Sequence, residues 1–562
     1  MTLMNSFPPA LVLLIGAVVA LALPGRIRPW ATVVAGGVVI IHLFWVLGAD
    51  ATLEVEWLGM TLTPLRVDKL SLVFGYVFAI ITLIGGVYAL HMRGRGEQVA
   101  SLLYGGSALG VVFAGDLLTV VAFWELMVVF SAYVILVGGR ERSRGAAVRY
   151  AFVHLAGGST LLAGVIWHVA DTGSLAFNAF DGGPAAWLVL LGFAVNAAIP
   201  PLHAWLSDAY PEASITGAVF LSAFTTKTAV YVLARGFAGW EILLFVGIIM
   251  ALYGVVYAVL ENDVRRLLAY HIISQVGYMV AAIGIGTEMA INGAAAHAFA
   301  HVLYKGLLFM GVGAVLYATG KSKLTELGGL GGAMKVTLVL YMVGAFSISA
   351  FPLFSGFVSK SLVIYAAEES HIAWAVFLLY GASVGTFLHT GLKLPYFIWG
   401  GPQSKEPVRR LPPGMYVAMG AAAFLCIAIG VYPAVLYDAL PFAVTYEPYT
   451  ADHIVSSLAL LGFTGLGFWL LLGQLKGEAA ITLDTDVSYR KARRPLEALV
   501  LSPLTKAFEM AGQAANSVVL AAEWAIASPN GLVRWGRRIP TGTAIVAVLL
   551  TAALTVLWSL AR

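Results

Sequence analysis

The sequence predicts an all-α polytopic membrane protein with about 14–16 transmembrane helices. Of its 562 residues, 60% are hydrophobic and only 11% are charged, whereas soluble domains carry about 25% charged residues. The mean hydropathy is +0.88, and apolar runs of about 18 or more residues, each long enough to cross a bilayer, recur along the chain. These features exclude water-soluble folds, nucleic-acid-binding modules and disulfide scaffolds. The single cysteine, Cys426, cannot form an internal disulfide or a cysteine-based metal site.

The apolar runs and the breakers between them define the expected membrane spans. The first run has neither a basic segment before it nor a small-residue cleavage site, so we expect a retained helix rather than a signal peptide. In order, the expected spans are 9–24, 30–48, 69–91, 98–115, 117–138, 146–170, 185–206, 213–235, 241–260, 264–286, 290–318, 335–368, 371–398, 414–434, 453–474 and 540–560.

Basic and acidic residues alternate between the loops. Loops after odd-numbered spans are mainly basic, as in 140–149, whereas loops after even-numbered spans are mainly acidic, as in 50–56. The positive-inside rule therefore places the basic loops in the cytoplasm and both termini outside. The same alternation supports the order of the spans, because one missed helix would invert every later assignment.

The segment 475–539 departs from this pattern. It carries a basic cluster at 490–494 and mixes apolar with polar residues over 497–526, which favours an amphipathic helix on the cytoplasmic membrane surface over a solvated connector. The chain therefore divides into N-terminal helices (1–97), a first repeat (98–235), a second repeat (241–398), C-terminal core helices (414–474), the amphipathic segment (475–539) and a final transmembrane helix (540–562).

Prolines interrupt two long spans at corresponding places. Pro200 and Pro201 interrupt the seventh span, and Pro352 interrupts the twelfth. The two spans lie an odd number of helices apart, so the halves that contain them run in opposite directions across the membrane. Paired broken helices with inverted topology are typical of transporter repeats that carry an ion path at their interface.

Several ionisable side chains lie deep within the expected spans, where each is costly unless it faces protein or water and is therefore a candidate functional residue. Glu125 lies about nine residues into its span, close to the middle of the membrane. His297, His301 and Lys305 recur at intervals of four residues and therefore share one face of a helix. The full set is Glu125, Lys227, His297, His301, Lys305, Lys360, His389 and Lys393.

A row of such groups, bridged by water, can carry protons stepwise. Burial and neighbouring charges shift the protonation equilibrium of each group, and histidine titrates near neutral pH with little perturbation. Zinc binding is a weaker alternative for His297 and His301, because no carboxylate or cysteine accompanies them and Lys305 adds a competing positive charge. Structural roles, such as capping a carbonyl at a broken helix, are a further alternative. We expect neither a metal nor a cofactor site.

Five segments together resemble the proton-translocating antiporter-like family, which includes the Mrp-type multisubunit Na+/H+ antiporter subunits and the large membrane-arm subunits of respiratory complex I. The resemblance covers roughly residues 70–400. The segments are Phe-Trp-Glu at 123–125, PLHAWLSDAY at 201–210, DVRRLLAYHIISQVGY at 263–278, His-x3-His-x3-Lys at 297–305 and FPLFSGF at 351–357.

The resemblance implies a proton route through two inverted half-channels, one in each repeat. Carried over by position, the roles of the family's glutamate, lysines and histidine fall on Glu125, Lys227, His301 with Lys305, and Lys360. The seventh span departs from the family, because Asn196 occupies the position of the usual lysine and cannot carry a proton by ionising.

The resemblance further implies a component like the D-type subunit of a multisubunit monovalent cation/H+ antiporter in a bacterial inner membrane. Its expected partners are other membrane subunits, H+, a cation such as Na+, and the lipid bilayer. Three alternatives remain: a membrane-arm subunit of a redox-driven complex, where the whole would be a translocase enzyme, the membrane partner of an inorganic-carbon (CO2/bicarbonate) uptake complex, and a non-conducting scaffold.

Overall fold

A computed structural model of the chain describes residues 3–48, 50–402, 407–475, 484–485 and 487. The chain divides into two compact units, Met1–Thr482 and Leu483–Arg562, and the following concerns the first. The predicted final span at 540–560 and nearly all of the predicted amphipathic segment at 475–539 lie outside the described residues.

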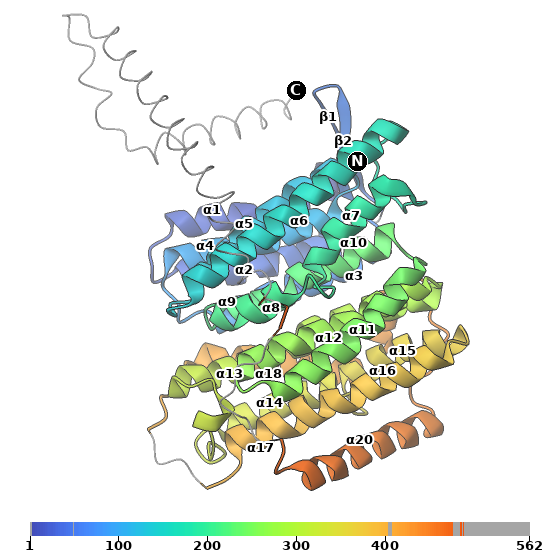
Figure 1. Cartoon of the computed structure of the whole chain (residues 1–562). Helices are drawn as coiled ribbons and strands as arrows, with labels where there is room; N and C mark the ends of the chain where they lie inside the picture. Colours follow the sequence, from blue (N-terminus) through green and yellow to red (C-terminus); the bar gives the residue numbers. More distant parts are fainter. Residues whose placement is uncertain (1–2, 49, 403–406, 476–483, 486, 488–562) are drawn as a thin grey trace, which may run out of the picture. The chain divides into compact units, whose positions relative to one another are not determined.

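The first half of this unit runs from a short 3-10 helix, η1 (Leu3–Ser6), to α10. Figure 1 shows α1–α10 gathered in one part of the unit and α11–α20 in the other. The elements of the first half are α1 (Pro9–Ala22), α2 (Arg28–Ile41), the π-helix η2 (His42–Val46), β1 (Thr52–Trp57), β2 (Met60–Arg66), α3 (Lys69–Tyr88), α4 (Arg95–Phe113), α5 (Leu117–Leu136), α6 (Ser143–Thr172), α7 (Gly183–Asn196), α8 (Ala204–Ala209), η3 (Tyr210–Glu212), α9 (Gly217–Ala223) and α10 (Thr225–Gly236).

Among its described residues, the second half consists of helices and the loops between them and has no β-strand. Its elements are α11 (Glu241–Leu260), α12 (Val264–Ile285), α13 (Glu288–Thr319), η4 (Leu324–Glu326), α14 (Lys335–Ile348), α15 (Ser355–Glu369), α16 (Ala373–Thr386), the π-helix η5 (Phe387–Lys393), α17 (Leu394–Trp399), α18 (Pro413–Val431), α19 (Ala434–Tyr437) and α20 (Ala451–Leu471).

The all-α polytopic fold predicted from the sequence is confirmed. Among the described residues, eleven helices are long and apolar enough to cross a membrane, and α1, α7 and α14 are shorter apolar helices. Every predicted span before residue 475 contains an α-helix. Three features were not predicted: a β-hairpin before α3, the interruption between α9 and α10, and the π-helical turns of η2 and η5.

The hairpin joins β1 and β2 in antiparallel pairing. Its turn residues, Leu58 and Gly59, have φ angles of 50° and 77°, and two positive φ values in a two-residue loop are the geometry of a type I′ turn. The strands alternate polar and apolar residues, so a search for continuous apolar runs does not detect them. The backbone N–H of Thr63 donates a 2.7 Å hydrogen bond to Asp116 and connects the hairpin to the start of α5.

The two predicted proline breaks have the same backbone pattern. After the last residue of α7, Ala198 has a φ of 59°, and after α14 the equivalent Ala350 has a φ of 57°. Each alanine is followed two residues later by a proline, Pro200 or Pro352. Each break also has a backbone hydrogen bond that spans five residues, from Ile199 to Ala194 and from Phe351 to Phe346. The two halves therefore interrupt their seventh and twelfth spans in the same way.

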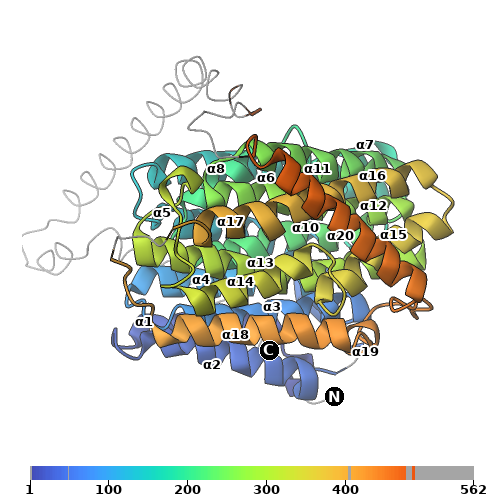
Figure 2. The same ribbon diagram turned by 90° about the horizontal axis from the view of Figure 1, so that it is seen from below.

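The central helix of this unit is α13, which packs against α3, α9, α10, α12, α14, α15 and α18. Both α12 and α13 are almost completely buried, although each carries histidine and α13 also carries Lys305. By contrast, α20 is mostly exposed and packs against α16 and η5 (Figure 2). The polar side chains of α13 are therefore held inside the protein and away from the lipid-facing surface.

Candidate functional site

Lys227 lies at the interruption between α9 and α10. The break at Phe224 leaves the carbonyl of Ser222 in the last turn of α9 free, because the final carbonyls of a helix lack partners within it. Lys227 is fully buried. Its Nζ donates a 2.8 Å hydrogen bond to that carbonyl and a 3.0 Å hydrogen bond to the hydroxyl of Thr226. The break therefore exposes a hydrogen-bond acceptor for this lysine within an otherwise apolar helix pair.

The three ionisable residues of α13 are also completely buried. His297 contacts the hydroxyl of Ser359 on α15 through Nδ1, at 3.3 Å, and the hydroxyl of Tyr304 through Nε2, at 3.5 Å. Among the described residues, both ring nitrogens of His301 and the Nζ of Lys305 have no hydrogen-bond partner. Buried polar atoms are normally hydrogen-bonded, so this face of α13 has unused capacity to bind a proton carrier or a small polar species.

Lys360 binds at the break after α14 in the way that Lys227 binds at the interruption between α9 and α10. Its Nζ donates a 2.7 Å hydrogen bond to the carbonyl of Ile348, the last residue of α14. The same ammonium lies 5.3 Å from the centroid of the Tyr278 ring on α12, within the range of a cation–π interaction. A freed carbonyl and an aromatic face thus hold the positive charge of Lys360 without a carboxylate.

Beyond α13, a second group of basic residues surrounds η5. The rings of His271 and His389 lie 5.5 Å apart, and Lys393 donates a 2.7 Å hydrogen bond to the carbonyl of Val259 at the end of α11. π-Helical turns such as η5 occur frequently at functional sites. His271 was not singled out from the sequence, although its place inside an apolar span is the signal that could have identified it.

Electrostatic interactions connect these groups into one buried row. Lys305 interacts with Lys227, and His297 interacts with both Lys227 and Lys360. His271 interacts with Lys305, Lys360, His389 and Lys393. The structure therefore brings together the predicted residues Lys227, His297, His301, Lys305, Lys360 and Lys393, along with His389 beside Lys393.

Glu125 is not brought into this row. It lies on α5, is only half-buried, and packs against α6 at Gly158, whose missing side chain leaves space for its carboxylate. Among the hydrogen bonds and ion pairs of the described residues, none joins Glu125 to Lys227, whose Nζ binds Ser222 and Thr226 instead. The sequence left open whether Lys227 pairs with Glu125, and the structure shows no such pair.

Asn196, at the departure from the family pattern, is fully buried at the end of α7. Its Oδ1 lies 2.7 Å from Nδ1 of His154 on α6. His154 was not predicted as a functional residue, although it lies inside the predicted span 146–170 and carries the same signal as the other buried histidines.

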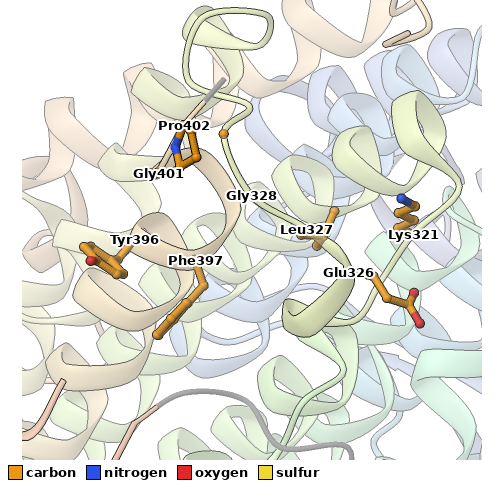
Figure 3. Close-up of a pocket in the computed structure, with 10 residues that line it drawn as sticks. Lys321, Glu326, Leu327, Gly328, Tyr396, Phe397, Gly401 and Pro402 are labelled. Atoms are coloured by element: carbon orange, nitrogen blue, oxygen red, sulfur yellow. The ribbon is translucent and has the colours of Figure 1, made fainter. Parts of the chain in front are cut away.

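The surface pocket drawn in Figure 3 lies apart from this row. It has a volume of about 530 Å³, and Lys321, Glu326, Tyr396 and Phe397 are among its lining residues, which include none of the buried ionisable groups. The glycine-rich turn at 328–332 contributes to it and pairs with the end of α17, where Gly329 donates a 2.7 Å hydrogen bond to Gly400.

Comparison with known proteins places the chain among membrane subunits. Residues 114–386 match the family model described as NADH:quinone oxidoreductase/Mrp antiporter, transmembrane. An uncharacterized protein of Mycobacterium tuberculosis, Rv0083, is 31% identical over 79% of this chain and 73% of its own length. The D-type Na(+)/H(+) antiporter subunit of Alkalihalophilus pseudofirmus is 32% identical over 53% of this chain and 64% of its own length.

Two solved structures show the same fold. A chain of the Mrp complex from Dietzia sp. superposes with a TM-score of 0.70 at 23% identity and covers 82% of this chain and all of that one. A chain of the membrane-bound sulfane sulfur reductase, an archaeal respiratory membrane complex, superposes with a TM-score of 0.72 at 24% identity and covers 97% of this chain and 99% of its own.

Proposed function

Because this chain belongs to the NADH:quinone oxidoreductase/Mrp antiporter family of membrane subunits, we propose that it is the proton-translocating subunit of a multisubunit monovalent cation/H+ antiporter. The exchanged cation is Na+ or a related monovalent ion, the partners are other membrane subunits, and the location is a bacterial inner membrane. The single observation that carries the proposal is the set of buried lysines and histidines gathered around α13.

In the proposed mechanism, protons pass along the row by mutual repulsion of neighbouring charges. Lys227 and Lys305 carry like charges that interact across a buried interior, where low dielectric strengthens their repulsion. A proton that arrives at one lysine therefore disfavours a proton on the other. His301 lies among these charges, and in the proposal its imidazole, the side chain whose ordinary pKa is nearest neutral pH, accepts a proton and passes it on.

The row spans both repeats and so provides a route along the middle of the protein. Lys227 belongs to the first repeat. His301 and Lys305 on the central helix α13 belong to the second repeat, as does Lys360 after the break. Lys393 lies at the far end and binds the carbonyl of Val259. In the proposal, Glu125 serves as the acidic entry group on α5, and cation movement in the partner subunits is coupled to the charge state of this row.

A redox-driven complex is the second candidate function. The observation that favours it is the superposition on the respiratory membrane complex, which extends over 97% of this chain rather than 82%. In that case the same row would translocate protons, and a partner subunit would supply the driving reaction.

Transport by the intact complex tests the proposal. The tagged full chain is purified from membranes with its partners, the partners are identified by mass spectrometry, and the complex is reconstituted into liposomes with an entrapped pH dye. A Na+ gradient is expected to drive proton movement, which Lys305→Ala abolishes and Lys335→Ala, a change at an exposed lysine, leaves intact. Proton movement only upon addition of an electron donor supports the redox complex, and no movement under either condition contradicts both functions.

A further inference from the structure

In the first half of the proposed route, α7 provides no titratable group between Glu125 and the central row. Glu125 lies on α5 against α6, and Lys227 binds the carbonyl at its own helix break. Asn196, which occupies the intervening position on α7, has an amide side chain that neither gains nor loses a proton. A proton route through this half therefore requires another group.

His154 occupies this gap. It lies on α6, is completely buried, and its Nδ1 is 2.7 Å from Oδ1 of Asn196. Because an amide oxygen only accepts hydrogen bonds, Nδ1 carries the hydrogen and donates it to Asn196. In the neutral ring, Nε2 is then the basic nitrogen, and Nε2 has no hydrogen-bond partner among the described residues. Asn196 thus sets the tautomer of His154 and leaves the basic nitrogen available.

On one side, Glu125 packs against α6 one turn away from His154. Gly158 follows His154 by four residues, so both lie on the same face of α6 one turn apart. A side chain at Gly158 would overlap Oε1 of Glu125, which shows that the carboxylate fills this space. The Gly158 position, against which the carboxylate lies, is therefore about one helical turn, roughly 5 Å along the axis, from the position of His154.

On the other side, His154 borders a chain of hydroxyl groups that leads to the central row. Its ring lies 4.1 Å from the ring of Tyr150, centroid to centroid. The Tyr150 hydroxyl is 3.3 Å from Oγ1 of Thr225, and Thr225 is 2.5 Å from the hydroxyl of Tyr104. Thr225 precedes Lys227 by two residues at the start of α10. Polar atoms thus extend from the edge of His154 to the helix turn that carries Lys227.

We propose that His154 is the proton-accepting residue of the first half-channel and that Asn196 is its positioning residue. This inference rests on the proposed function and adds a residue and a step to it. The proton leaves the carboxyl group of Glu125, binds Nε2 of His154 to form the imidazolium, and departs toward Lys227, which returns His154 to its neutral form. Asn196 accepts the Nδ1 hydrogen throughout, so the ring keeps its orientation in both states.

Exchange of the titratable group between α6 and α7 tests the proposal. In reconstituted complexes, His154→Gln is expected to lower proton flux at least tenfold. Adding Asn196→Lys to this variant is expected to restore a substantial fraction, because the lysine returns a titratable group to the same gap. His168→Gln, a change of the same type near the end of α6, serves as the matched control and is expected to keep wild-type flux.

A second variant distinguishes loss of the proton-accepting group from misfolding of the protein. The exchange His154→Asn with Asn196→His keeps one imidazole and one amide in contact, and it is expected to transport protons where His154→Asn alone does not. Wild-type flux in His154→Gln, or loss of flux that neither the lysine nor the exchange restores, overturns the role of His154. Absence of flux in the wild-type complex under every driving gradient instead overturns the proposed function itself.

Discussion

Arg149 on α6 and Asp208 on α8 form a two-pronged ion pair, in which Nε donates to Oδ2 at 2.6 Å and Nη2 donates to Oδ1 at 3.0 Å. The Asp208 side chain is only 8% exposed. This pair connects α8, which follows the first proline break, to α6, the helix that carries His154. Arg149, near the start of α6, therefore has a structural role.

We expect Arg149→Gln to destabilise this junction. Hydrogen bonds to charged groups contribute about 1.5–3 kcal/mol each, and partial exposure of Arg149 places the loss at the lower end. Arg149→Lys keeps the charge but loses the planar fork, so its effect is expected to be intermediate. Thermal unfolding in detergent measures both, and equal midpoints for the wild type and both variants would contradict a role for the fork.

The two central lysines are expected to respond differently to removal. Lys305→Met abolishes proton flux without lowering the thermal midpoint, because Nζ of Lys305 is buried without a hydrogen-bond partner among the described residues and burial of such a group is unfavourable. Lys227→Met abolishes flux and also lowers the midpoint, because it removes hydrogen bonds to Ser222 and Thr226. Parallel flux and melting measurements separate the two effects, and equal destabilisation by both changes would refute the distinction.

Gly158→Ala is expected to displace the Glu125 carboxylate. The added Cβ would overlap Oε1 of Glu125, and the end of this flexible side chain can rotate away at little cost in stability. We therefore expect a marked loss of proton flux with a small change in thermal midpoint. Gly462→Ala on α20, where a Cβ meets no neighbouring atom, is the control. If Gly158→Ala transports protons like the wild type, the position of Glu125 against α6 does not affect proton flux.

The link between Asp68 and Arg235 predicts a pH-dependent contribution to stability. Burial raises the pKa of the Asp68 carboxyl, but the Arg235 charge and the Ser71 amide outweigh it and hold this pKa below its ordinary value. Arg235 lies 2.6 Å from Oδ2 of Asp68. Because the folded state favours the carboxylate, the stabilisation is complete above the ordinary pKa of aspartate, about 3.9, and disappears as the pH falls through the lowered value.

The corresponding measurement compares the wild type with Asp68→Asn. Their thermal midpoints are expected to differ most near neutral pH and to converge as the pH falls below the ordinary aspartate pKa of about 3.9. A constant difference over this range would show that the charge of Asp68 does not contribute through this pair.

Continuous apolar runs allowed prediction of the helices, because membrane spans depend on length and hydropathy alone. Buried lysines such as Lys305 were equally visible, since a charge within a span is rare. The sequence could not show that Glu125 is separated from Lys227, because this depends on how α5 and α6 pack. It also did not single out His154, whose significance rests on its contact with Asn196, a residue more than forty positions away.

The break between α9 and α10 was missed for a different reason. Neither proline nor glycine marks Phe224, so the local sequence carries no breaker signal. The hydrogen bonds that the break makes possible for Lys227 become apparent only in three dimensions.

The hydrogen bonds of Lys227 and Lys360 to helix-end carbonyls have one further consequence. An amine that releases its proton still carries two N–H bonds, so the carbonyls of Ser222 and Ile348 can retain their donors when either side chain becomes neutral. Protonation and deprotonation of Lys227 and Lys360 therefore require no rearrangement of the backbone. The interrupted helices can stay fixed while only protons move between these two lysines.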